Sequence, residues 1–197
     1  MATDREARRR HPTPDDDVVD RAAGLVARDA VTGTSLRQAT YAAALARAGL
    51  LQHFPRESML LDAVARINRR AVGELVARAT ALPPGRERER VVVEGLVDFA
   101  IARPGIAALG RSRVQARTSD PAAEERGLAL LDAMGVDAAH EPERVITVVC
   151  AFAGIDVATY LASEGYEPDE WRGVVVAAAM RTLGHPDLHS VGDVGVA

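Results

Sequence analysis

Apolar residues recur along most of the chain at intervals of three and four, the spacing that places side chains on one face of an α-helix. They are mostly Ala, Val and Leu, whereas aromatic residues make up only 4% of the sequence. This composition favours closely packed helices over sheets, in which β-branched and aromatic residues are enriched. Apolar residues amount to 48% of the chain, which is enough to bury a core. The sequence therefore predicts an all-α fold.

Prolines, glycines and capping residues divide this pattern into about nine helices. Asp15, Asp16 and Asp17 supply an N-cap and an acidic first turn for the first helix. Pro55 ends a short third helix, because the residue before a proline is pushed out of the α region. Pro121 and Gly135 mark the two ends of a later helix. The expected helices cover residues 15–28, a segment that begins at Thr34 or Ser35, and residues 47–53, 56–80, 87–102, 105–117, 121–134, 141–165 and 167–184.

Residues 34–64, TSLRQATYAAALARAGLLQHFPRESMLLDAV, have the layout of a helix-turn-helix, in which a supporting helix holds a second helix across the major groove of DNA. Leu45 would fill the turn, and Leu50 would anchor the reading helix in the core. The supporting helix needs small residues on its inner side, and for this role it has Ala39, Ala42, Ala43 and Ala44. The stretch therefore predicts a small DNA-binding domain.

Charge is distributed unevenly along the chain, whose net charge is −4. Residues 1–80 contain 13 arginines and 10 acidic residues, whereas residues 81–197 contain 11 arginines and 18 acidic residues. A mildly basic N-terminal part and an acidic remainder suit a small anion-facing module on a larger body. We expect a disordered arm at 1–14 and a three-helix DNA-binding domain at 15–65. The helix 56–80 then leads into a larger ligand-binding and dimerisation domain at 66–184, which a loose tail at 185–197 follows.

The segments VVDRAAGLVARD, TSLRQ and ARAGLLQHFPRESMLL resemble the tetracycline-repressor (TetR) family of bacterial transcription regulators over residues 17–65. The most specific part is HFP followed by a Leu-Leu pair. The resemblance implies an all-helical homodimer whose N-terminal domains bind a palindromic double-stranded DNA operator. It also implies a C-terminal cavity for a small-molecule effector, and a four-helix dimer interface made by the last two long helices. We therefore expect a ligand-responsive transcriptional regulator, a repressor that a small apolar ligand releases from DNA.

The chain departs from the family pattern at four positions of the motif. Ala44 stands at the usual turn glycine, and Ala46 stands where a serine or threonine opens the reading helix. Leu51 replaces a tyrosine that contacts phosphate, and Glu57 replaces a lysine. These departures support an alternative, in which a TetR-like dimer with a decayed DNA-reading head acts as a ligand-binding or protein-interaction module.

Several side chains remain that can donate hydrogen bonds to DNA. Arg47 and Gln52 are the natural base readers, because Arg pairs with guanine and Gln with adenine. Arg47 also fits an ordinary solvated helix position, and His53, beside Phe54, fits packing as well as binding. The expected DNA-binding residues are Thr34, Ser35, Arg37, Arg47, Gln52, His53 and Arg56.

The C-terminal part supplies candidates for a ligand pocket and a dimer interface. Pockets are mostly apolar with a few placed polar groups, and the expected lining residues are Phe99, Arg111, Gln115, Cys150, Asp156 and Tyr160. Cys150 lies within VITVVCAFAG and is expected to be a small core residue rather than a sensor thiol. The last two long helices are more apolar than one subunit needs, and the expected interface residues are Val145, Val149, Phe152, Val174, Val175 and Ala178.

Other features of the sequence exclude several classes. The chain has one cysteine, so an internal disulfide is impossible. Its start lacks the apolar core of a signal peptide, and no apolar run reaches the roughly 18 residues of a membrane span. It has no Glu-x-x-His spacing, Gly-rich phosphate loop or nucleophile elbow, and His185 and His189 have no evident third ligand. We expect a cytoplasmic protein that is not an enzyme and has neither cofactor nor metal.

Overall fold

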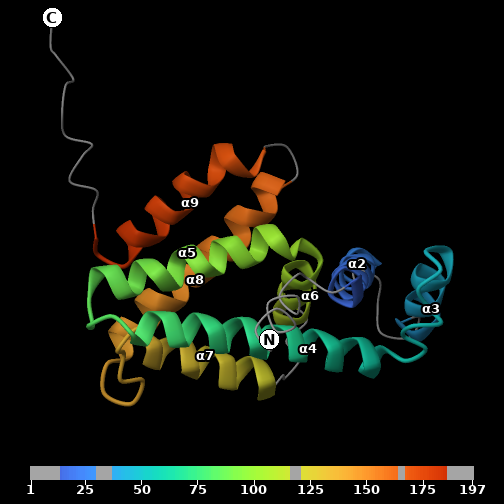
Figure 1. Cartoon of the computed structure of the whole chain (residues 1–197), viewed down its shortest axis with the longest axis horizontal. Coiled ribbons are helices and arrows are strands. Elements are labelled where there is room, and N and C mark those ends of the chain that lie inside the picture. Colours follow the sequence, from blue (N-terminus) through green and yellow to red (C-terminus); the bar gives the residue numbers. More distant parts are fainter. Residues whose placement is uncertain (1–13, 30–36, 116–120, 164–166, 186–197) are drawn as a thin grey trace, which may run out of the picture. The chain divides into compact units, whose positions relative to one another are not determined.

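The computed structural model describes residues 14–29, 37–115, 121–163 and 167–185, and all regular secondary structure in these ranges is helical (Figure 1). The all-α prediction is confirmed, but the described ranges contain eight helices, one fewer than expected. They are α2 (Pro14–Asp29), α3 (Arg37–Arg47), α4 (Glu57–Thr80), α5 (Arg86–Ala102), α6 (Pro104–Gln115), α7 (Pro121–Ala133), α8 (Pro142–Ser163) and α9 (Pro168–Thr182).

Proline opens most of these helices. A proline at the first helical position loses no hydrogen bond, since the first amide groups of a helix have no partner within it, and its fixed φ suits the helix. This arrangement begins α2, α6, α7, α8 and α9. The prediction of a helix from Pro121 to a terminating glycine is confirmed, because α7 ends at Ala133 and Gly135 adopts φ 74°.

The chain forms two compact units. Of the described residues, 14–29, 37–70 and 103–115 form unit 1, and 71–102, 121–163 and 167–185 form unit 2. The long helix α4 therefore contributes its first part to unit 1 and its last part to unit 2. Unit 1 also contains α6, a segment that the sequence analysis placed in the C-terminal domain.

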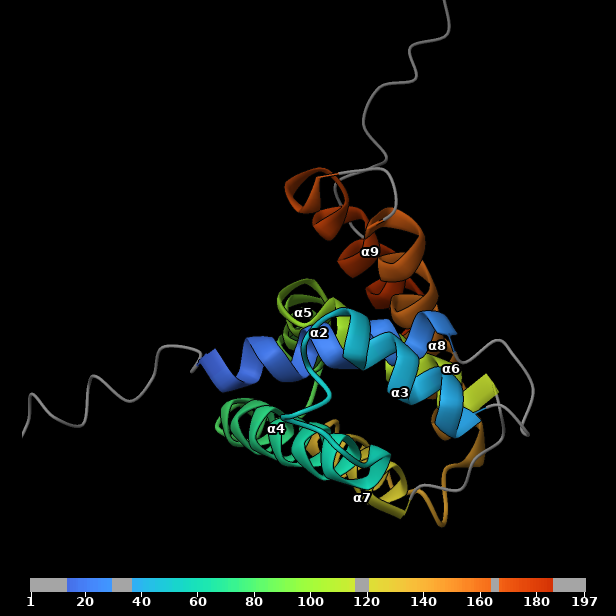
Figure 2. The ribbon, with the colours of Figure 1, turned by 90° about the vertical axis from the view of Figure 1, so that its right-hand side faces the viewer.

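Unit 1 is built on the close packing of α2 against α6, and α2 also contacts α3 (Figures 1 and 2). At the crossing, Gly24 of α2 meets Gly105 of α6. A Cβ on Gly105 would overlap the carbonyl oxygen of Asp20, so the two backbones approach this closely only because Gly105 has no side chain. The crossing thus depends on one glycine in the first turn of α6.

The acidic residues of α2 bind groups outside their own helix. Asp16 forms an ion pair with Arg70 of α4, and Asp17 lies 2.8 Å from the guanidinium of Arg103. The carboxylate of Asp20 accepts a hydrogen bond of 2.9 Å from the amide of Ile106, at the start of α6. Burial raises the pKa of Asp20, while the backbone hydrogen bonds at Ile106 and Gly105 act in the opposite direction. These carboxylates hold α2 against the start of α6 and against α4.

Unit 2 has a core of mostly aliphatic residues where α5, α8 and α9 pack against one another (Figure 1), and α7 also contacts α5. Val92, Val93 and Val148 are completely buried there. The other helices add Leu75 and Ala79 of α4, Leu130 and Ala133 of α7, Ala151 and Ile155 of α8, and Trp171, Val175, Val176, Ala179 and Met180 of α9. Small and branched side chains at most of these positions allow the helices to approach closely, as the composition predicts.

Replacement of Gly105 by alanine tests the crossing of α2 and α6. We expect Gly105→Ala to reduce the free energy of unfolding by about 2–3 kcal/mol, because the new methyl group meets backbone that cannot move aside. The control is Gly110→Ala in the same helix, where an added Cβ meets nothing within 4 Å; this change should be neutral or stabilise by about 0.5–1 kcal/mol. Urea unfolding followed by circular dichroism measures both. Equal stabilities of the two variants would contradict the packing described here.

Candidate functional site

The segment between α3 and α4 is a turn, and the predicted reading helix over residues 47–53 does not form. The amide of Gly49 donates to the carbonyl of Ala46, and the amide of Leu50 donates to the carbonyl of Leu45. Gly49 itself has φ 70°. This pattern is a Schellman motif, which ends a helix with a left-handed residue. The helix prediction was wrong because Gly49 lies just past the end of α3 rather than inside a further helix.

The turn is held in place by buried side chains and by one side-chain hydrogen bond. Leu45, Leu50 and Phe54 are buried, as the sequence analysis expected for a core anchor and a turn residue. The hydroxyl of Tyr41 donates a hydrogen bond of 2.9 Å to the carbonyl of Phe54. Burial raises the pKa of Tyr41 to about 12, so the phenol stays protonated and remains a donor at neutral pH. The sequence analysis did not identify Tyr41, because a tyrosine among alanines gives no sign of its distant backbone partner.

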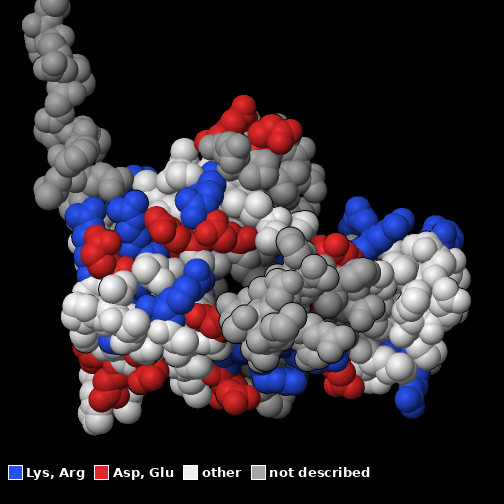
Figure 3. Space-filling model, in the orientation of Figure 1, with Lys and Arg blue, Asp and Glu red and all other residues white. Residues whose placement is uncertain are grey.

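Four of the predicted DNA-binding residues are exposed around this turn: Arg47, Gln52, His53 and Arg56. Arg47 is the last residue of α3, and its Nε donates to the carbonyl of Ala43 at 3.2 Å. The ring of His53 lies 6.5 Å from that of Phe54, while its own side chain faces solvent. On the face shown in Figure 3, arginines lie at the edges of the region of α3, at the right of the view, and uncharged residues fill the surface between them.

The remaining predictions for this motif have mixed outcomes. Thr34 and Ser35 lie outside the described residues, and Arg37 begins α3 but its side chain is outside them too. Ala44 faces the core as expected, whereas Ala43 is exposed, contrary to the prediction. Glu57, the first residue of α4, is half-buried.

The predicted pocket residues are divided between the two units. Arg111 is half-buried on α6 and Gln115 ends that helix, both in unit 1. In unit 2, Phe99 of α5 and Asp156 of α8 are half-buried. Cys150 and Tyr160 of α8 are exposed, and the expectation that Cys150 is a core residue was wrong. No single unit therefore brings the six residues together.

The predicted interface residues also separate into two sets. Val149 and Val174 are 54% and 64% exposed, and Ala178 is exposed as well. Val145 and Phe152 instead pack against the core of unit 2, and Val175 is buried in it. These three point inward because α8 and α9 each use one side for the core of their own unit.

An exposed apolar stripe runs along α8. It comprises Ile146, Val149, Cys150, Ala153, Val157 and Tyr160, whose spacing of three and four residues places them on one face of the helix. Ile146 and Val157 are 62% and 50% exposed, and the sequence analysis missed both as surface residues. The neighbouring helix α9 exposes Val174 and Ala178. A row of large apolar side chains in water is a typical sign of an interaction surface. We call it the α8 stripe.

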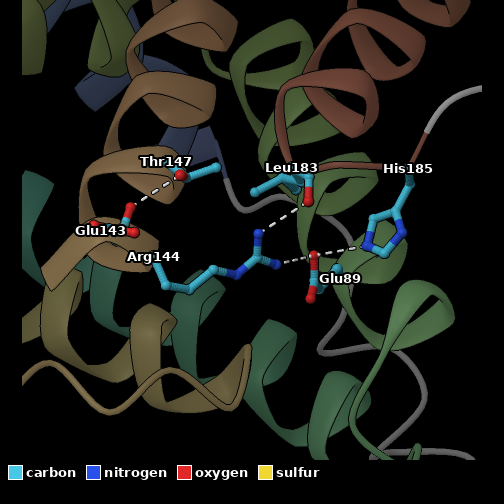
Figure 4. A network of polar contacts seen from close by, with 6 residues as sticks. All are labelled: Glu89, Glu143, Arg144, Thr147, Leu183 and His185. Carbon is cyan, nitrogen blue, oxygen red and sulfur yellow. Dashed lines mark hydrogen bonds and ion pairs between the residues drawn. The ribbon is translucent and has the colours of Figure 1, made fainter. Parts of the chain in front are cut away.

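A buried carboxylate connects three helices of unit 2 (Figure 4). Glu89 of α5 is only 6% exposed. Its Oε2 lies 2.6 Å from a guanidinium nitrogen of Arg144 on α8 and 3.0 Å from Nε2 of His185, just after α9. A second nitrogen of Arg144 donates to the carbonyl of Leu183 at 2.9 Å. The network therefore joins the start of α5 and the start of α8 to the end of α9.

Within the described part of the chain, no group of three or more His, Cys, Asp or Glu side chains is placed to hold a metal ion. His189, half of the histidine pair noted in the sequence, lies outside that part. Among the helices described, none has the length and apolarity required to cross a membrane.

Comparison with known proteins gives no assignment. No protein-family model matches the chain, and no curated protein matches it.

The network of Glu89 should be important for the stability of unit 2. We expect Arg144→Met to reduce the free energy of unfolding by about 2–3 kcal/mol, because among the described residues it leaves the buried carboxylate with His185 as its one side-chain partner. The control is Arg90→Met, which removes an exposed arginine paired with Glu94 four residues away; it should cost less than about 0.5 kcal/mol. Chemical denaturation measures both variants. A loss for Arg144→Met no larger than that of the control would mean that Glu89 does not depend on this partner.

Proposed function

We propose that the chain is a homodimeric transcription regulator that contacts DNA through the turn after α3 and responds to a small apolar ligand. The observation that carries the proposal is the set of exposed donors around this turn, Arg47, Gln52, His53 and Arg56. Residues 41–56 contain no acidic residue, and Glu57, the next acidic residue along the chain, begins α4 and is half-buried. The resemblance of residues 17–65 to the TetR family supports the same function.

The turn suits contacts with the DNA backbone better than extensive base reading. Phosphate contacts provide most of the affinity of DNA-binding proteins, and arginine, glutamine and histidine side chains all make them. Without a helix over residues 47–53, fewer side chains reach base edges in the groove. We therefore expect binding that is strongly salt-dependent and modestly specific. Tyr41 contributes by holding the turn through its bond to Phe54.

A second copy of the chain is the proposed partner at the α8 stripe. Residues 145–155 contain no charged residue, so this surface is best covered by another apolar surface. A two-fold symmetric pair brings the same face of each copy together and needs no other protein. A homodimer would also present two turns to a palindromic operator, as the TetR resemblance implies.

A second candidate is a dimer that binds a ligand or a protein partner without reading DNA. The Schellman motif at Gly49 favours this candidate, because it removes the helix that such domains place in the major groove. In this case the α8 stripe and the core of unit 2 would retain their roles, and the exposed residues of the turn would be ordinary solvated side chains.

DNA binding distinguishes the two candidates. Fluorescence anisotropy of the DNA that flanks the gene, measured at several salt concentrations, should show binding that weakens as salt rises. We expect Arg47→Ala to weaken binding to this DNA by about 5- to 100-fold, the range for loss of one specific arginine contact. The control, Arg78→Ala, removes another exposed arginine, from the part of α4 in unit 2, and should change affinity less than about threefold. Equal affinity for this and for random DNA would favour the second candidate.

The oligomeric state tests the α8 stripe. We expect the wild-type chain to be a dimer and Val149→Asp to be a monomer, because a carboxylate in the apolar interface would lose its hydration without a partner. The control is Leu128→Asp on α7, because Leu128 and Val149 are both 54% exposed. Light scattering after size-exclusion chromatography gives the mass of each. A dimeric Val149→Asp, or a monomeric Leu128→Asp, would place the interface elsewhere. Protection of Cys150 from a thiol reagent in the dimer provides an independent check.

A further inference from the structure

Trp171 of α9 has a buried indole N–H without a hydrogen-bond partner. The residue is only 8% exposed, and among the described residues its Nε1 is the one buried side-chain nitrogen or oxygen left unsatisfied. An unpaired buried donor is unfavourable because it loses its bond to water and gains none in the protein. Such groups are rare in native structures, and each calls for a specific explanation.

The other buried polar side chains that the structure describes in unit 2 have partners. The hydroxyl of Thr159 donates to the carbonyl of Ile155 at 2.8 Å. The carboxylate of Glu89 binds Arg144 and His185. The unpaired N–H of Trp171 therefore stands out in a core whose remaining polar groups are satisfied.

The position of the indole is constrained by its neighbours. Arg172, the next residue, makes two hydrogen bonds of 2.6 Å and 2.9 Å to the carboxylate of Asp98 on α5. These bonds hold the first turns of α9 against α5. Trp171 and Val175 are four residues apart on the inner side of α9, and both belong to the aliphatic core.

We propose that Trp171 is a ligand-binding residue, whose indole N–H donates a hydrogen bond to an oxygen acceptor of a neutral, largely apolar small molecule bound in the core of unit 2. The indole nitrogen only donates, so the ligand must supply the acceptor. The surrounding core is aliphatic, and the adjacent charges of Arg172 and Asp98 are paired with each other, so a charged ligand would lack a counter-ion. The inference rests on the proposed ligand response and names the chemistry of the ligand.

Ligand binding at this position would act on the proposed dimer surface through α9. Trp171 and Val175 lie on the buried side of α9, whereas Val174 and Ala178 lie on its exposed side. A molecule that displaces the first turns of α9 to reach the indole also displaces these exposed residues. The two sides of one rigid helix thus connect the ligand to the surface that contacts a second copy.

The test uses two small probes of nearly the same shape, acetophenone and α-methylstyrene, which differ in having a carbonyl oxygen or a CH2 group. Trp171 is the single tryptophan of the chain, so the full-length protein has one indole N–H signal in a nitrogen–proton correlation spectrum. We expect acetophenone to move this signal and to bind about threefold to tenfold more tightly than α-methylstyrene, as one net hydrogen bond provides. An indole signal that neither probe moves, or equal affinities, would overturn the proposal.

Two variants show whether the preference belongs to Trp171. Calorimetric titration of Trp171→Phe, which lacks the N–H, should give equal affinities for the two probes. Thr182→Val removes the hydroxyl of an exposed residue in the last turn of α9 and should keep the preference. A preference that persists in Trp171→Phe would overturn the proposal; if that variant does not fold, the signal of the wild-type indole decides. All measurements are made without DNA, so they can succeed or fail independently of operator binding.

Discussion

The buried carboxylate of Glu89 requires partners, and the groups that meet this requirement come from α8 and from the residues that follow α9. A charge with 6% exposure is stable in an aliphatic unit only because Arg144 and His185 are within hydrogen-bonding distance. Arg144 also binds the carbonyl of Leu183, so the same side chain fixes the end of α9. The relative placement of α5, α8 and α9 follows from this network together with the aliphatic core. The α8 stripe and the environment of Trp171 both depend on that placement.

Much of the fold was predictable, because helix content depends on local signals. Prolines and glycines gave the helix ends at Pro121 and Gly135, and the spacing of apolar residues gave most helix ranges correctly. The helix expected over residues 47–53 failed for a reason that is also local. A glycine such as Gly49 can lie within a helix, although it weakens the helix, or it can end a helix in the left-handed conformation. Here the helix ends, because Leu45 and Leu50 are both buried and the amide of Leu50 donates to the carbonyl of Leu45. The resemblance of the residues around Gly49 to the TetR pattern favoured a helix at this position.

The candidate sites were less predictable, since they depend on which side of a helix faces the core. Residues 145–155 of α8 are uncharged throughout, so their pattern does not distinguish the inner face from the outer one. Contacts with α5 and α9 determine which face of α8 turns toward the core. They bury Val148, Ala151 and Ile155 and leave Ile146 and Val149 exposed to solvent. For the same reason Phe152 and Val175, expected at the interface, belong to the core. Tyr41 and Trp171 could not be predicted from the sequence. Tyr41 matters through its hydrogen bond to the carbonyl of Phe54, thirteen residues away, and Trp171 through an indole N–H that has no partner among the described residues.

Polar side chains fix neighbouring segments in both units, and the indole of Trp171 is the exception among the described residues, which bears on function. In unit 1, Asp20 and Tyr41 each have a partner that fixes a neighbouring segment, at the start of α6 and at the turn before α4. A turn that is fixed in this way suits a binding surface that keeps its shape when a partner binds. In unit 2, the indole of Trp171 is held in place but unpaired, so a conformation that gives it an acceptor would be favoured by the bond gained. Because α9 carries both this donor and the exposed Val174, a ligand that satisfied the donor would alter the apolar surface directly. In the proposed regulator, a change in dimer geometry would then be the simplest response of unit 2 to its ligand.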